Sequence, residues 1–282
     1  MLNKGPELSF SGLTDIGLSR PNNEDVWVAL PELGFFALAD GMGGHQAGEV
    51  AAKEAIDQLC LELQAHWVDQ KVTHPVERLR RAIEKANQRV YEKGRNTQSL
   101  SGMGTTLCCL YCTEDSIVYA HVGDSRIYRY RNRLLQQLTQ DHSLFAKWLS
   151  TDRKASECET PYPYKNVITR AIGTCKRVVP EIAVDTLQSG DLYILCSDGL
   201  SDALTIQDIE KIIERSENLD IAAARLIEKA KIKGSSDNIT VLLIQCLADG
   251  KNLFRQQFDN SPRSKSLPSD VGRSERPSSQ SI

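Results

Sequence analysis

The sequence predicts an α+β fold, in which antiparallel β-sheets pack together and helices cover their outer faces. Seven strand-like apolar runs occur along the chain, and several are joined by only a few residues. Short connections are typical of antiparallel hairpins, because a parallel crossover needs a dozen or more residues. Four segments with helical periodicity lie between these runs, in two pairs. Hairpins interleaved with paired helices indicate the α+β class.

The strand-like runs are recognised by their apolar and β-branched content and by the turn residues that bound them. They span residues 26–30, 34–39, 105–112, 116–122, 126–130, 191–196 and 239–247. The first two flank the turn Pro31-Glu32 and therefore predict a hairpin.

The helical segments each place apolar residues on one stripe. The first pair spans residues 48–63 and 76–91, and Pro75 suits the first turn of the second helix. Thr205 begins the third, with the sequence Thr-Ile-Gln-Asp. Asp220 precedes the fourth, which spans 221–233 and stops at Gly234.

The composition is that of a soluble protein with a sizeable core. The chain has 282 residues, of which 40% are hydrophobic and 25% charged, which excludes a wholly disordered chain. Residues 1–248 contain no linker or internal repeat, so we expect one domain. Residues 249–282 end in a serine- and proline-rich stretch with few large apolar side chains, which predicts a disordered tail.

Charge and hydropathy exclude several classes of function. The net charge of −3 gives no global positive field, so binding to nucleic acid is disfavoured. No run of 18 apolar residues and no signal-peptide core occurs, so we expect no membrane contact and a cytoplasmic location. Most of the eight cysteines lie in apolar runs, which predicts free buried thiols. The Cys109-Cys112 pair lacks the second pair that a zinc site requires.

Carboxylates stand at the ends of the predicted strands. The residues are Asp40, Asp124 and Asp198 after an apolar run, and Glu24, Asp25 and Asp237 before one. If neighbouring strands bring these ends together, the carboxylates converge at one rim of the sheets, where their repulsion is costly without cations between them. Oxygen ligands without histidine or thiolate suit Mg²⁺ or Mn²⁺.

Each of these carboxylates has an alternative interpretation as a turn residue. Asp-Gly after an apolar run is common turn chemistry, and Gly123-Asp124 between two runs is also compatible with a hairpin loop. The recurrence at five strand ends favours a shared metal cluster. The glycines after Asp40 let the backbone approach a ligand and leave a carbonyl free to bind a metal, or else form a strained turn.

Other reaction classes lack their motifs. The chain has no C-x5-R loop of a cysteine phosphatase, no H-E-x-x-H, no G-x-S-x-G, no H-R-D and no P-loop. Its five histidines are scattered, and a surface or core-packing role is favoured for each; they are His45, His66, His74, His121 and His142.

Eight segments, in order along the chain, are similar to motifs of one family. The first four are Arg20-Pro21-Asn22-Asn23-Glu24-Asp25, Asp40-Gly41-Met42-Gly43-Gly44-His45, Gly104-Thr105-Thr106 and Val122-Gly123-Asp124-Ser125-Arg126. The others are Leu138-Thr139-Gln140-Asp141-His142-Ser143, Thr169-Arg170-Ala171-Ile172-Gly173, Ser197-Asp198-Gly199-Leu200-Ser201-Asp202 and Gly234-Ser235-Ser236-Asp237-Asn238-Ile239-Thr240. With these segments, residues 10–247 resemble the bacterial branch of the metal-dependent Ser/Thr protein phosphatases of type 2C.

The resemblance implies a four-layer α-β-β-α sandwich with metals at one rim between two antiparallel sheets. It implies two Mn²⁺ or Mg²⁺ ions and a third that is typical of bacterial members. The implied metal residues are Glu24, Asp25, Asp40, Gly41, Asp124, Asp198 and Asp237. Asp40 would bridge two ions, with Glu24 and the Gly41 carbonyl on one side and Asp198 and Asp237 on the other. Asp25 would lie behind these ligands, and Asp124 would hold the third ion together with Asp198.

The resemblance also implies the reaction, with Asp40 and Arg20 as catalytic residues. A water bridging two metals would attack the phosphorus of phosphoserine or phosphothreonine. Arg20 would bind the phosphate through a bidentate contact that lysine cannot reproduce. Eukaryotic relatives carry a histidine two residues after the bridging aspartate as the proposed general acid, and here that residue is Met42. His45 or water on the third metal are the alternative proton donors.

The substrates implied are phosphorylated proteins, namely those of a bacterial Ser/Thr kinase, and we expect a monomer. One alternative is a phosphatase of the same fold dedicated to a single regulatory protein. Another is an inactive member that serves as a binding module, which the presence of Arg20, Asp40, Asp198 and Asp237 disfavours. Residues 143–167 correspond to the family's flap beside the active site, as a substrate contact or as a variable surface loop.

Overall fold

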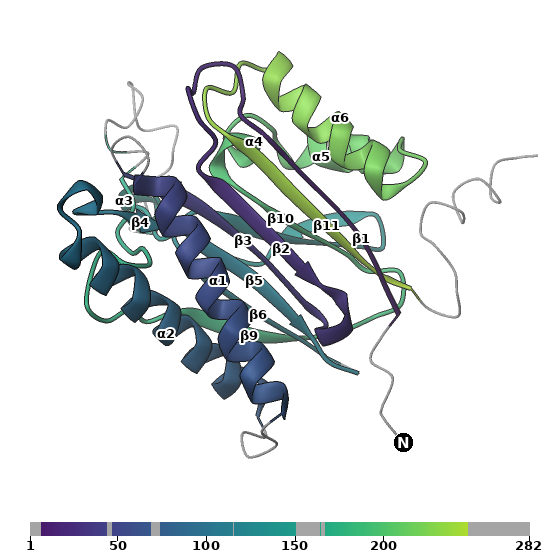
Figure 1. Cartoon of the computed structure of the whole chain (residues 1–282). Helices are drawn as coiled ribbons and strands as arrows, with labels where there is room; N and C mark the ends of the chain where they lie inside the picture. Colours follow the sequence, from purple (N-terminus) through teal and green to yellow (C-terminus); the bar gives the residue numbers. More distant parts are fainter. Residues whose placement is uncertain are drawn as a thin grey trace, which may run out of the picture.

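Two antiparallel β-sheets form the centre of the molecule (Figure 1). The computed structural model describes residues 7–43, 47–68, 74–114, 116–150, 164 and 167–247. The first sheet has the order β1-β11-β10-β7-β8, with bounds Glu7–Asp15, Ile239–Leu247, Leu192–Cys196, Arg126–Arg131 and Leu134–Gln137. The second has the order β2-β3-β5-β6-β9, with bounds Asp25–Leu30, Phe35–Met42, Leu107–Cys112, Ser116–Val122 and Glu181–Thr186. The short β4 (Gly104–Thr105) pairs with the end of β3.

Helices cover the outer face of each sheet, which gives the four-layer α-β-β-α sandwich (Figure 1). The long helices α1 (Ala47–Val68) and α2 (Pro75–Asn96) pack on the second sheet. The helices α5 (Ile206–Glu214) and α6 (Leu219–Ile232) pack on the first. Two short helices, α3 (Leu144–Leu149) and α4 (Asp198–Ser201), lie near one end of the sheets. The predicted fold class is confirmed.

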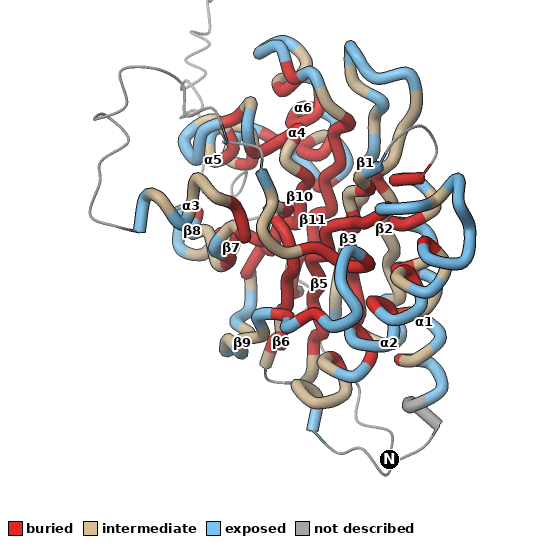
Figure 2. The backbone as a smooth tube through the Cα atoms, turned by 90° about the vertical axis from the view of Figure 1, so that its left-hand side faces the viewer, coloured by how far each residue is buried: buried red, intermediate tan, exposed pale blue. Residues whose placement is uncertain are grey.

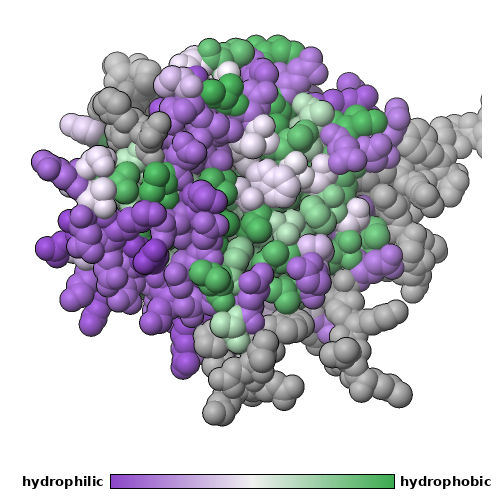
Figure 3. Space-filling view, in the orientation of Figure 1, coloured by the Kyte–Doolittle hydropathy of each residue, from purple (hydrophilic) through white to green (hydrophobic). Residues whose placement is uncertain are grey.

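Three hydrophobic cores lie between the four layers of helices and sheets, and the central strands contribute side chains to two of these cores. In β3, Phe35 and Ala37 face α1 and α2, whereas Phe36 and Leu38 face the opposite sheet. Because both faces of such a strand are buried, its sequence is apolar throughout rather than alternating. Figure 2 shows this buried interior running through the central strands. The outer surface over α1 and α2 is mainly hydrophilic, and apolar side chains such as Phe10 and Leu13 are exposed along β1 (Figure 3).

All seven predicted strands occur, although the run 105–112 is divided into β4 and β5, and three further strands were missed. The missed strands β1, β8 and β9 are all edge strands, with at most one buried residue each. An edge strand that is half exposed needs no apolar run, so its sequence gives a weak signal. The short helices α3 and α4 were missed for a similar reason, since one or two turns show no periodicity.

The helix N-termini follow the predictions with one correction, whereas α1 and α2 each end five residues later than predicted. Thr205 forms a capping box with Asp208, and Pro75 lies in the first turn of α2. The prediction of Asp220 as the N-cap of α6 is wrong, because the Asn218 side chain accepts the hydrogen bond from the Ile221 amide at 2.9 Å. Both residues are good caps by type, and the helix begins two residues earlier than its apolar stripe suggested.

The strands on either side of Gly123-Asp124 do not form a hairpin. Strand β6 belongs to the second sheet and β7 to the first, so this segment crosses between the sheets. Seven of the cysteines are described, and all seven are free thiols, as expected. Among the described helices, none is long and apolar enough to span a membrane. The predicted tail at 249–282 and most of the predicted flap lie outside the described residues.

Candidate metal centre

The strand register brings the predicted carboxylates to one end of both sheets. In the second sheet, Asp25 at the start of β2 is opposite Asp40 near the end of β3. In the first sheet, Cys196 at the end of β10 is opposite both Arg126 and Val241. The residues just beyond these strand ends are Asp124, Asp198 and Asp237. All six predicted carboxylates therefore lie at the same rim of the sandwich.

Asp25 joins the two sheets at this rim. Its side chain is only 6% exposed, and its Oδ2 accepts hydrogen bonds from Ser197 Oγ at 2.9 Å and Thr240 Oγ1 at 2.6 Å. Both hydroxyls come from the opposite sheet. Burial raises the pKa of Asp25, and the two hydroxyls oppose this effect. Asp25 is thus held in place by the protein itself, behind the other carboxylates.

Asp40 is positioned by two threonines through its backbone. Thr106 Oγ1 accepts a hydrogen bond from the Asp40 amide at 3.0 Å, and Thr105 Oγ1 donates to the Asp40 carbonyl at 2.8 Å. These two bonds use only the Asp40 backbone, so its carboxylate remains available to the neighbouring carboxylates. Burial, followed by repulsion from Asp25 and Asp198, raises the pKa of Asp40 well above its ordinary value.

The chemistry of these side chains fits a hard divalent cation. One buried oxygen each of Asp25, Asp124 and Asp198 finds no hydrogen-bond donor within the part of the chain that the structure describes. Burial raises the pKa of Asp124 to about 6, and burial and repulsion from Asp124 and Asp237 raise that of Asp198. Unpaired buried carboxylate oxygens are costly, and a cation would satisfy them. Oxygen ligands of this kind suit Mg²⁺ or Mn²⁺.

The absence of side chains at Gly41 and Gly48 leaves the space that the Glu24 carboxylate occupies. A Cβ atom on Gly48 would lie 2.0 Å from Glu24 Oε2, and one on Gly41 would lie 2.2 Å from the Gly48 carbonyl oxygen. The start of α1 therefore packs directly against the end of β3 and against the Glu24 carboxylate. Burial raises the pKa of Glu24, while Asn22 donates to Glu24 Oε1 at 3.1 Å. In the sequence, Gly48 only marks the start of a helical pattern, and nothing near it indicates this contact with Glu24.

Arg20 supplies the positive charge at the rim. Its Nη2 atom lies 2.6 Å from Asp237 Oδ2, and its side chain is 51% exposed, so one side of the guanidinium faces solvent. A shallow cavity of about 220 Å³ opens beside it, with Asp198, Asp237 and Lys233 in its lining. Arg20 is not part of this lining but is linked to it through its bond to Asp237.

Several supporting residues were not predicted as such. Asn238 Oδ1 accepts from the Glu24 amide at 2.9 Å, and Asn238 Nδ2 donates to the carbonyls of Ile16 and Asn22, both at 3.0 Å. This side chain fixes the loop that carries Arg20 and Glu24. Its position next to Asp237 within a motif segment was the only available signal in the sequence.

The described histidines lie away from the rim carboxylates or pack in the core, as expected. His121 and His142 are buried with stacked rings 4.4 Å apart, and their ligand atoms lie within 4.8 Å of those of Glu181. Their ring nitrogens already bond to the Gln140 carbonyl and the Gly123 amide. Within the described residues, the rim carboxylates do not form a group as compact as this cluster. His45 lies outside the described residues.

Comparisons with known proteins show what the chain is similar to in sequence and in fold. The family model described as Protein phosphatase 2C matches residues 21–227. Protein phosphatase PhpP of Streptococcus pneumoniae is 35% identical over 243 residues, covering 84% of this chain and 97% of the relative. The Mycobacterium tuberculosis serine/threonine phosphatase PstP superimposes with a TM-score of 0.77 at 33% identity, covering 86% of this chain and 99% of that one. The catalytic domain of PstP in complex with two manganese ions gives a TM-score of 0.75, with the same identity and coverage.

Proposed function

Because the chain belongs to the protein phosphatase 2C family, we propose that its rim carboxylates hold the divalent cations with which it hydrolyses phosphoserine and phosphothreonine on proteins. The protein is a metal-dependent Ser/Thr protein phosphatase. The observation that best supports the assignment of the site is the convergence of carboxylates at one rim, three of which carry a buried oxygen without a hydrogen-bond donor among the described residues. The retained ligand types argue against an inactive binding module.

The proposed ligands divide into two groups around Asp40. Glu24 and the Gly41 carbonyl would hold one ion with Asp40, and Asp198 and Asp237 would hold the other. Divalent cations bound there lower the pKa of water and neutralise charge on the phosphoryl oxygens. The PstP catalytic domain is described with two manganese ions, which supports two ions here, with Mn²⁺ or Mg²⁺ as the metal. A third ion would be held by Asp124 together with Asp198.

Arg20 would bind the phosphate of the substrate. In the structure its guanidinium bonds to Asp237 through Nη2 and remains half exposed. A guanidinium has five N–H donors in a planar fork, so Arg20 can retain Asp237 and still donate to a phosphoryl oxygen. The same contact would neutralise charge that develops on the phosphoryl group during hydrolysis. Met42 cannot protonate the leaving oxygen, which leaves His45 or water as the donor.

The substrates are phosphoproteins, and we infer that they are products of a bacterial Ser/Thr kinase. Such a phosphatase would act in the cytoplasm as a monomer, with residues 1–248 as the catalytic domain and 249–282 as a tail. Activity on generic phosphothreonine peptides would argue against a phosphatase dedicated to one regulatory protein.

The test is phosphate release from a phosphothreonine peptide with the full chain, first without added metal, then with increasing Mn²⁺, then with EDTA. Asp40→Asn is the matched variant, because it removes one charge with little change of shape. The proposal predicts activity that rises with Mn²⁺, disappears with EDTA and is lost in the variant. Equal activity in Asp40→Asn and the unmodified chain would overturn the site assignment.

A further inference from the structure

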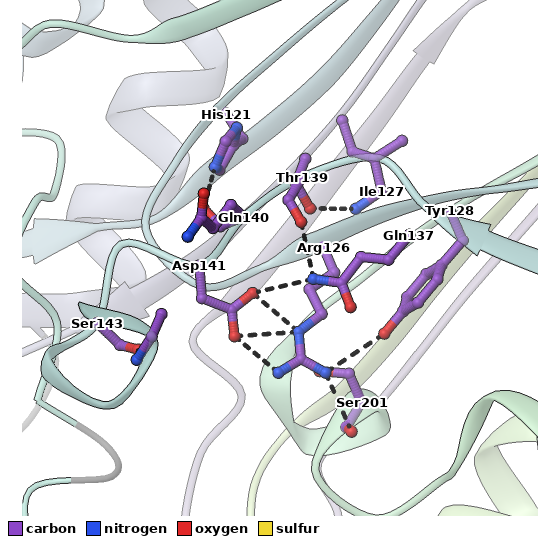
Figure 4. Close-up of polar contacts among 11 residues, drawn as sticks. His121, Arg126, Ile127, Tyr128, Gln137, Thr139, Gln140, Asp141, Ser143 and Ser201 are labelled. Carbon is purple, nitrogen blue, oxygen red and sulfur yellow. Dashed lines mark hydrogen bonds and ion pairs between the residues drawn. The ribbon is translucent and has the colours of Figure 1, made fainter. Parts of the chain in front are cut away.

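A buried ion pair lies at the rim beside the proposed ligands. Arg126, the first residue of β7, donates from Nε to Asp141 Oδ1 at 2.9 Å and from Nη2 to Asp141 Oδ2 at 2.7 Å (Figure 4). The two side chains are 22% and 15% exposed. Gln137 Nε2 lies 3.4 Å from the same carboxylate, and Arg126 Nη1 lies 3.4 Å from the Tyr128 hydroxyl. The guanidinium is therefore held as a bidentate fork from several sides.

This pair connects three segments that meet at the proposed third-ion site. Arg126 is two residues after Asp124, and its Nη1 also donates to the carbonyl of Ser201 at 3.5 Å (Figure 4). Ser201 is the last residue of α4, and Asp198 is the first. Asp141 precedes the segment that leads into α3. A single guanidinium thus bonds to parts of the chain that carry both Asp124 and Asp198.

The backbone on either side reinforces the connection. The His142 amide donates to the Gly123 carbonyl at 2.9 Å, and the Gly123 amide donates to His142 Nδ1 at 3.1 Å. Residues 123 and 142 are therefore tied together directly beside Asp124 and Asp141. A small cavity lies between these segments, lined by Asp124, Asp198, Asp202, Arg126 and Asp141.

A role in stability alone does not explain the placement of this pair. Buried ion pairs contribute little net stability, because desolvation offsets much of their attraction. The same strand offers a comparison at its other end, where Arg131 donates to both oxygens of Asp191 at 2.7 and 2.6 Å. That pair is also bidentate and is more deeply buried, with exposures of 17% and 1%, but it lies away from the carboxylates of the rim.

We propose that the Arg126–Asp141 pair is a positioning device that holds Asp124 and Asp198 at the spacing required by the third divalent cation. The inference rests on the proposed function, since it assumes that the rim carboxylates bind metal. Arg126 and Asp141 touch neither the substrate nor the reacting atoms in this account; they act through Asp124 and through the end of α4.

Geometry and charge make different predictions for Arg126→Lys and the same prediction for Asp141→Asn. Arg126→Lys keeps the positive charge but loses the bidentate fork and its reach to Ser201. Asp141→Asn keeps the shape but leaves the positive charge of Arg126 uncompensated beside a cation site. If only charge mattered, Arg126→Lys would bind the third ion normally and Asp141→Asn alone would bind it weakly. If positioning matters, both variants bind it weakly.

The experiment measures free Mn²⁺ by electron paramagnetic resonance during titration of the full chain. The variants are Arg126→Lys and Asp141→Asn, with Arg131→Lys as the matched control, and thermal unfolding reports whether each is folded. We expect three ions per unmodified chain, and in the two test variants a Kd of the weakest site raised at least about tenfold with the tighter sites unchanged. Arg131→Lys should leave all sites within about twofold. Phosphatase activity lost in Arg126→Lys should return at high Mn²⁺.

Several results would overturn the inference. Normal third-site affinity in Arg126→Lys would show that charge alone matters, and equal weakening in Arg131→Lys would show a general effect on the sheet. An unmodified chain that binds only two ions while hydrolysing phosphopeptide would remove the third site but leave the proposed function intact. An unmodified chain without any tight Mn²⁺ site or any activity would instead contradict the proposed function.

Discussion

Replacing Asp124 with asparagine should stabilise the metal-free protein at neutral pH. Burial raises the pKa of Asp124 from 3.8 to about 6. Because the folded-state pKa is higher than the unfolded-state pKa, the folded protein binds this proton more tightly. The stability gained from protonated Asp124 is therefore fully present below about pH 4 and is lost as the pH rises through about 6. The difference between the folded-state and unfolded-state pKa values of Asp124 corresponds to about 3 kcal/mol of unfolding free energy, at about 1.4 kcal/mol for each pKa unit.

The assay is urea unfolding in EDTA at pH 4 and at pH 7, for the unmodified chain and Asp124→Asn. Shared effects of pH on other groups cancel in the difference between the two proteins. We expect the variant to be more stable by about 3 kcal/mol at pH 7 and nearly equal at pH 4. Saturating Mn²⁺ should reduce or reverse the difference at pH 7, because a cation stabilises the state that binds it. A variant that is no more stable than the unmodified chain at pH 7 would refute the reasoning.

Asp15 provides a control with the opposite sign. Its carboxylate accepts a hydrogen bond from Lys231 Nζ at 2.9 Å, which lowers its pKa. A lowered folded-state pKa gives stability that is present above the ordinary value and lost as the pH falls through the folded one. Asp15→Asn should therefore destabilise the protein at pH 7, in contrast to Asp124→Asn.

Three further predictions concern the same rim. Gly48→Ala should weaken Mn²⁺ binding by about tenfold or more, because the new methyl group would lie 2.0 Å from Glu24 Oε2. The helix content should stay normal in circular dichroism. Unchanged Mn²⁺ affinity would show that this close contact does not disturb Glu24. Asp198→Asn should nearly abolish phosphate release while the variant stays folded, and normal turnover would argue against its role as a ligand. Thr240→Val should lower the unfolding free energy by about 1.5–3 kcal/mol at pH 7 in urea, since it removes a 2.6 Å hydrogen bond to the buried Asp25 carboxylate; a loss below about 0.5 kcal/mol would show that this bond is unimportant.

The sequence predicted the rim because buried strands leave a clear apolar run, and the run fixes where the strand ends. Asp40, Asp124 and Asp198 could be placed this way, and the structure brings them together as expected. The turn interpretation of Gly123-Asp124 failed because sequence spacing does not reveal which sheet a strand joins. Edge strands such as β1 were missed, since half their residues face solvent.

The residues that position the ligands could not be predicted from local sequence. Ser197 and Thr240 bond to Asp25 across sequence separations of 172 and 215 residues. Gly48 is required by a contact with Glu24 that exists only after α1 has packed on β3. The pairing of Arg126 with Asp141 likewise depends on the path of the chain between the sheets. Such contacts are consequences of the tertiary fold and have no pattern of their own along the chain.

The central claim is that Asp40 and the carboxylates around it hold divalent cations. Crystals of the full chain grown with Mn²⁺, with diffraction measured at the manganese absorption edge, test this claim most directly. We expect anomalous density peaks beside Asp40, within coordinating distance of the carboxylates of Asp198 and Asp237. Peaks found only elsewhere, for instance beside His121 and His142, or no peak at the rim in an active protein, would contradict it.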